Sequence, residues 1–255
     1  MSTYDYAIEF IDGIPTEIEA SNCTISDLKK EFSCPTPGCT AKLKVCSLDG
    51  AYPPYFKKTH GTEHSSFCLI PSKSFNKNFI DPSTFDPKNL YDKTILNPTT
   101  TKSPTDLSYN KDKSSKKSNL INLNKLSTTY YYLKSYPIYK KINGFFIKDI
   151  LADIRTAKIY SKVIYDLKIV ECVILSFNNN NIIKVGYPIN SPHLKLNLKF
   201  SNKDDFKFIL DKCRDKTTGK IIPFSISKPI IVVIADWNNF TGAIHSRKQI
   251  MFPKV

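Results

Sequence analysis

The 255-residue sequence predicts an α+β fold that is mostly β. Three observations support this prediction. Paired cysteines and histidines lie in the first 68 residues, many apolar segments of the later part are strand-like, and an amphipathic helical segment lies among them. We therefore expect an N-terminal zinc ribbon followed by a C-terminal OB-like β-barrel domain with one or two helices.

The metal site is predicted from two pairs of potential ligands. Cys34 and Cys39 flank a turn of prolines and a glycine, "CPTPGC", and His64 and Cys68 follow as a second pair. Structural zinc is bound tetrahedrally by paired Cys and His side chains, and an odd count of seven cysteines argues against a disulfide framework. We expect these four residues to hold one structural Zn²⁺, with His64 and Cys68 on one helix face.

Two further residues leave the ligand set open. Cys46 could replace one member of the first pair, and His60 could replace His64 or lie uncoordinated near the metal. The alternative interpretation is that all of these are ordinary thiols and surface histidines.

Short strands surround the ligand pairs. Segments 4–10 and 15–20 predict a hairpin around the Asp12-Gly13 turn. The alternating segment 40–48 predicts another strand. These elements complete a zinc-ribbon domain over residues 1–70.

The segment after the ribbon predicts little regular structure. Residues 69–97 contain several prolines, and residues 98–119 are almost all Thr, Ser, Lys, Pro and Asn. Such a composition cannot bury enough apolar surface to offset the entropy lost on ordering. We assign residues 71–125 to an irregular or flexible linker.

Residues 126–255 predict the basic, β-rich, OB-like domain. Residues 126–137 favour a helix that ends at Pro137, and residues 203–216 favour a second helix with apolar residues on one face. The predicted strand segments are 145–155, 157–177, 181–189, 194–200, 228–237 and 242–252.

Positive charge is concentrated after the Cys/His segment. Residues 1–68 carry 6 basic and 9 acidic side chains, a net −3, and the remainder carries 31 basic and 14 acidic, a net +17. A polyanion, most commonly nucleic acid, is the predicted partner; a lysine-rich solubilising surface is the alternative. Because no apolar stretch could span a bilayer and the start lacks a signal-peptide pattern, we expect a cytoplasmic protein without a membrane partner.

Basic and aromatic residues alternate in segments that suit single-stranded nucleic acid. On a strand, Lys158, Tyr160 and Lys162 would share a face. We expect contacts with RNA or single-stranded DNA from Arg155, Lys158, Tyr160, Lys162, Arg247 and Lys248.

The segments "FSCPTPGC", "YF" and "HSSFC" resemble the N-terminal zinc-ribbon segment of bacterial CoiA-like proteins. A weaker resemblance is to the ring-activated zinc-finger ribonuclease of phage defence. The resemblance covers about 35 residues and implies metal binding. CoiA-like proteins often carry a nuclease domain with spaced acidic residues and a lysine. The sequence has no convincing acidic-x-Lys core of that kind, so that activity is not carried over.

Whether the chain is an enzyme stays open at this point. No P-loop, G-x-G-x-x-G or G-x-S-x-G motif occurs. For metal-independent RNA cleavage, His245 would be the acid or base and Arg247 the phosphate clamp, because both would share a face of an alternating strand. Asp153 with Arg155, and His60 beside the metal, are the next catalytic candidates.

These observations predict a zinc-containing bacterial protein that binds RNA or single-stranded DNA. Two alternatives remain. The first is a zinc-finger ribonuclease or nuclease of a phage-defence system, with a phage protein as its partner. The second is a protein-recognition or assembly module with incidental positive charge, which would give homo-oligomers.

Overall fold

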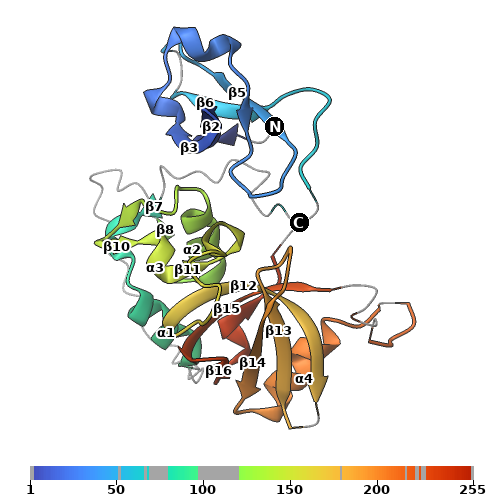
Figure 1. Cartoon of the computed structure of the whole chain (residues 1–255). Coiled ribbons are helices and arrows are strands. Elements are labelled where there is room, and N and C mark those ends of the chain that lie inside the picture. Colours follow the sequence, from blue (N-terminus) through green and yellow to red (C-terminus); the bar gives the residue numbers. More distant parts are fainter. Residues whose placement is uncertain are drawn as a thin grey trace, which may run out of the picture.

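The computed structural model describes residues 3–50, 53–65, 68, 80–96, 121–178, 180–215, 217–221, 224 and 228–253. Its described elements form an N-terminal antiparallel sheet and a larger body that contains a closed barrel (Figure 1). No helix in these ranges has the length and apolar character needed to cross a membrane.

The N-terminal sheet is antiparallel, with strand order β1-β6-β5-β4-β2-β3. Its strands are β1 (Thr3–Tyr4), β2 (Tyr6–Ile11), β3 (Ile14–Glu19), β4 (Phe32–Ser33), β5 (Lys42–Cys46) and β6 (Tyr55–Lys58). Short 3₁₀ helices η1 (Ala20–Asn22) and η2 (Ile25–Lys29) lie between β3 and β4. The predicted hairpin is confirmed, because Asp12 and Gly13 both adopt the positive φ that a two-residue hairpin turn requires.

A helix lies in the region predicted to be irregular. Helix α1 spans Pro87–Ile95, and β7 (Ile80–Asp81), η4 (Pro82–Thr84) and β8 (Ile121–Asn122) flank it along the chain. The Asp86 carboxylate accepts hydrogen bonds from two backbone amides of the first turn, and Leu90 is buried against the body. The prediction for residues 69–97 is therefore wrong over this helix, and the linker composition of residues 98–119 lies outside the described residues.

Helix α2 (Leu126–Lys134) confirms the predicted helix, but the segment after it departs from the predicted strands. Residues 145–155 form β10 (Phe145–Phe146), α3 (Ile147–Ile150), β11 (Leu151–Ala152) and the start of η5 (Ile154–Thr156), with β9 (Lys141–Ile142) paired to β10. Asp153 and Thr156 cap each other's backbone amides and turn the chain into η5. Residues 157–160 then form turns and residues 161–162 a bend, so Lys158, Tyr160 and Lys162 do not share a strand face.

The barrel confirms the OB-like prediction. Its five strands close in the order β12-β13-β14-β16-β15-β12, with β14 and β16 parallel and the other neighbours antiparallel. They are β12 (Asp166–Asn178), β13 (Ile182–Tyr187), β14 (Leu194–Phe200), β15 (Ile230–Asn238) and β16 (Thr241–Ile244). Helix α4 (Lys203–Asp211) connects β14 to β15 and buries its apolar face in the barrel core. The last elements are η6 (Arg247–Gln249) and β17 (Ile250–Met251).

A buried cluster of four charges lies beneath the N-terminal sheet. Lys134 Nζ is 2.6 Å from Glu171 Oε2 and 3.1 Å from Asp153 Oδ2. Arg155 Nη2 is 2.8 Å from Asp153 Oδ2. The side chains of Lys134, Asp153 and Glu171 are fully buried. The cluster is neutral, with two cations and two anions, and so avoids an uncompensated buried charge.

The same cluster reaches across to the N-terminal sheet. The Arg155 Nη1 group donates hydrogen bonds to the hydroxyl of Tyr6 on β2 and to the carbonyl oxygen of Tyr136. Burial alone would raise the pKa of Asp153, but the charges of Arg155 and Lys134 outweigh it and lower this pKa to about 2. Burial raises the pKa of Glu171 despite Lys134. Arg155 therefore holds the sheet and the body together through an anchored, ionised pair.

Replacing Lys134 by Met should strongly destabilise the fold. The change keeps the bulk of the side chain but leaves two buried carboxylates with one cation fewer, which typically costs about 3–5 kcal/mol. Lys140→Met is the matched control. The Lys140 side chain is 46% exposed and its Nζ lies 3.8 Å from Glu19 Oε1, so this surface ion pair is worth at most about 1 kcal/mol. Urea unfolding gives the free energy of unfolding of both variants. Equal unfolding midpoints for the two variants would contradict the stabilising role of the charge cluster.

Candidate metal centre and barrel surface

Four side chains from two segments of the N-terminal sheet, the β4–β5 loop and the segment after β6, meet at one point. Cys34 follows β4, Cys39 precedes β5, and His64 and Cys68 follow β6. One ligand atom from each residue lies within 4.8 Å of all the others. The structure therefore brings the four predicted ligands together in an arrangement that could hold one metal ion.

The individual distances are short. Cys34 Sγ and Cys68 Sγ are 3.6 Å apart, and His64 Nδ1 is 3.4 Å from the sulfurs of both Cys39 and Cys68. Cys46 on β5 and the exposed His60 are not part of this group within the described residues. His64 and Ser65 are not helical, so the predicted helix face is wrong at its start, and residues 66–67 lie outside the described residues.

Backbone amides point at the sulfurs. The Thr36 amide lies 3.5 Å from Cys34 Sγ, and the Ser65 amide lies 3.5 Å from Cys39 Sγ. Gly38 supplies the positive φ of 77° that turns the "CPTPGC" loop back toward Cys39. Such amide donors favour the thiolate form, which is the form that ligates metals.

A hydrogen bond with Tyr4 orients the His64 ring toward the cysteines. Its Nε2 is 2.7 Å from the hydroxyl of Tyr4, while Nδ1 faces the sulfurs. The pKa of His64 is raised, first by its hydrogen bond with Cys68. The pKa of Cys34 is also raised, by its hydrogen bond with Cys68 and by burial. A cation held by these residues would reverse this preference and favour the deprotonated thiolates.

The other predicted contact residues are dispersed. Tyr160 is buried inside the body, where its hydroxyl donates to the carbonyl oxygen of Lys148. The Arg155 side chain is nearly buried in the charge cluster and lines only the cleft described below, so neither residue lies on an open surface. Asp153 is fully buried and serves the charge cluster, which leaves it out of reach of a substrate. Lys158 and Lys162 are exposed.

The C-terminal candidates do not share a strand face. Strand β16 ends at Ile244, and Ser246 caps η6, so the expected alternation between His245 and Arg247 is wrong. The exposed His245 has Nδ1 3.1 Å from Ser201 Oγ. The Arg247 guanidinium lies 4.5 Å from the ring centre of Phe208, and Lys248 is exposed beside it.

The structure shows a basic barrel surface that the sequence analysis did not single out. Leu194, Leu196, Leu198 and Phe200 of β14 are in the core, so Lys195, Asn197 and Lys199 face outward. Lys184 of β13 pairs with Asn197 across the ladder. The alternation in "LKLNLKF" carried this signal. We call Lys184, Lys195, Asn197 and Lys199 the barrel face.

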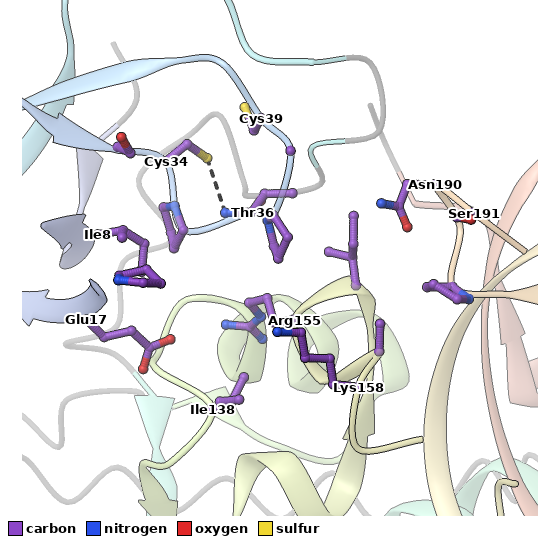
Figure 2. A pocket seen from close by; sticks show the side chains of 18 of the residues that line it. Ile8, Glu17, Cys34, Thr36, Cys39, Ile138, Arg155, Lys158, Asn190 and Ser191 are labelled. Carbon is purple, nitrogen blue, oxygen red and sulfur yellow. Dashed lines mark hydrogen bonds between the residues drawn. The ribbon is translucent and has the colours of Figure 1, made fainter. Parts of the chain in front are cut away.

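Two hollows lie near the barrel face, and Asn197 of that face lines the first of them. One, of about 750 Å³, lies at the β15–β16 turn and is lined by Tyr91, Asn197, Asp236, Asn238, Asn239, Phe240, Thr241, Ala243 and His245. The other is a cleft of about 810 Å³ between the metal-binding loop and the body (Figure 2).

The chain matches no protein-family model, and no match was found among curated proteins or solved structures. The resemblance of the ribbon segment to CoiA-like proteins therefore stays a prediction.

Single substitutions should separate the ligands from their neighbours. Cys39→Ser and His64→Ala each remove one member of the cluster and should lower the bound divalent metal well below one ion per chain. Cys46→Ser and His60→Ala are matched controls on nearby residues outside the cluster. Elemental analysis of the purified variants measures the metal. Full metal content in Cys39→Ser, or loss in Cys46→Ser, would contradict this ligand set.

Proposed function

We propose that this chain is a structural-zinc protein that binds single-stranded nucleic acid on the barrel face. The zinc assignment is supported by geometry. Tetrahedral zinc, with ligand distances of about 2.3 Å to sulfur and about 2.0 Å to nitrogen, places two sulfurs about 3.8 Å apart and a sulfur and a nitrogen about 3.5 Å apart. The distance of 3.6 Å between Cys34 Sγ and Cys68 Sγ is close to the first value. The distances of 3.4 Å from His64 Nδ1 to the sulfurs of Cys39 and Cys68 are close to the second. Four protein ligands close the coordination sphere, which favours a structural role.

The charge of the barrel face is the observation that carries the proposal. Lys184, Lys195 and Lys199 are exposed on two adjacent strands, and no ion pair joins any of them to a residue in the described ranges. Neither β13 nor β14 contains an acidic residue. Unpaired lysines in a row attract phosphates and release condensed counterions on binding.

The hollow at the β15–β16 turn supplies groups that suit unpaired bases. Phe240 is 46% exposed at its rim, where a ring can stack on a base. The amides of Asn197, Asn238 and Asn239 offer donors and acceptors for base edges. In OB-fold proteins the face of the second and third barrel strands and the loop between the last two strands bind oligonucleotides, and these correspond to β13, β14 and the β15–β16 turn.

The ionic contribution can be measured on the lysines. For single-stranded nucleic acid, each neutralised phosphate contributes about −0.7 to the slope of log affinity against log salt. Lys195→Ala with Lys199→Ala should weaken binding of oligo-dT or oligo-U and flatten this slope by about 1.4. Fluorescence anisotropy across a salt series measures it.

A second pair of lysines provides the control for that experiment. Lys203→Ala with Lys207→Ala removes the same charge from the exposed side of α4 and should leave the slope nearly unchanged. Equal slopes for both double variants and the wild type would remove the barrel face as the binding surface.

Cleavage is the second candidate, because His245 and Asp236 line the same hollow as the proposed base contacts. If the metal-loaded protein cleaves labelled RNA, His245→Ala should slow cleavage by about 10²–10⁴-fold while leaving anisotropy titrations unchanged. Binding with no cleavage under any condition rejects the ribonuclease. Absence of both supports the protein-recognition alternative.

A further inference from the structure

The cleft under the metal-binding loop is lined by apolar groups from both parts of the chain. Pro35 and Pro37 come from the loop between Cys34 and Cys39, and Ile138 and Tyr139 come from the body. Tyr139 is 61% exposed. Figure 2 shows the loop facing Arg155 and Lys158, with Asn190 and Ser191 at one end and Glu17 at the other. A concave, mostly apolar lining with a few placed polar groups is typical of a small-molecule or nucleobase site.

Two opposite charges line this cleft without pairing. No hydrogen bond or ion pair joins Glu17 or Lys158 to another described side chain, and the two do not pair with each other. Burial raises the pKa of Glu17, although Arg155 acts in the opposite direction. The Glu17 side chain is half-buried in the wall of the cleft, so a hydrogen-bond donor from a ligand would replace water that its carboxylate has lost. A suitable ligand carries donors at one end and an anion at the other.

The cleft is connected to the barrel face. His193 is exposed, lines the cleft, and is followed in steps of two residues by Lys195, Asn197 and Lys199. Asn197 in turn lines the hollow at the β15–β16 turn. At about 3.3 Å per residue, His193 in the cleft and Asn197 in the other hollow are about 13 Å apart along the chain, with the outward-facing Lys195 between them. A strand bound on the barrel face can therefore continue into the cleft.

We propose that the cleft receives a guanine nucleotide of the bound single strand. The inference rests on the proposed function and adds its base preference. The base lies between the prolines and Tyr139, its Watson–Crick edge faces Glu17, and a phosphate lies against Lys158.

Guanine is favoured by the donor pattern that a carboxylate requires. Its N1–H and N2 amino group are adjacent donors that match the two oxygens of Glu17. Adenine and cytosine each place an acceptor nitrogen beside their amino group. Thymine and uracil flank their single N–H with two carbonyl oxygens, which the carboxylate repels.

The test compares ten-nucleotide strands of oligo-dT and oligo-U with the same strands carrying one central guanine or one central hypoxanthine. The metal-loaded full chain should bind the guanine strand about tenfold more tightly than the unsubstituted strand. Hypoxanthine lacks the N2 amino group and should give an intermediate affinity. This comparison uses the wild-type chain and does not depend on any variant folding.

Two variants on the same strand of the sheet complete the experiment. Glu17→Gln should abolish the guanine preference and leave oligo-dT affinity unchanged. Glu19→Gln removes the same charge two residues away, outside the cleft, and should retain the preference. A lysine-dependent affinity for oligo-dT with no guanine preference overturns the cleft inference and leaves the barrel face intact. A preference that persists in Glu17→Gln overturns it as well. Binding of none of the strands overturns both proposals.

Discussion

The relative placement of the metal-binding sheet and the barrel depends on the ion pair between Asp153 and Arg155. Asp153 is held by Lys134 from α2, and Lys134 is held by Glu171 from β12, so the pair is fixed to the barrel wall. Arg155 then reaches Tyr6 in the sheet. Since Arg155 also lines the cleft, this pair lies where the two walls of the cleft meet and helps to fix their separation.

The sequence was most informative where spacing alone determines the chemistry. The ligand pairs at Cys34, Cys39, His64 and Cys68 were identifiable because metal ligation requires few residues at short separations. The barrel was also accessible, since alternation in segments such as 194–200 reports which side chains are buried. The hairpin at Asp12-Gly13 followed from the turn residues themselves.

Prediction failed where the same local pattern is compatible with two structures, and contacts with residues distant in sequence select one of them. Residues 155–162 alternate as a strand would, yet Asp153 and Thr156 cap η5, and Tyr160 turns inward to Lys148. Apart from Asp153, the partners of Arg155 lie on α2, β2 and the loop after α2, far away in sequence, so its role as a buried connector left no local signal. Glu17 was missed for the same reason, because its significance comes from the cleft that the body forms opposite it.

The position of β3 as an edge strand of its sheet has a consequence for solubility. The barrel closes on itself and exposes no free strand among its five, but β3 is the last strand in the order of the N-terminal sheet. An edge strand can pair with a strand of a second chain through its unpaired backbone amides and carbonyls. Pro15 lacks an amide proton, and Glu17 and Glu19 add like charges along this strand. Two copies of β3 placed side by side would repel each other, so these residues also protect the chain against strand-to-strand aggregation.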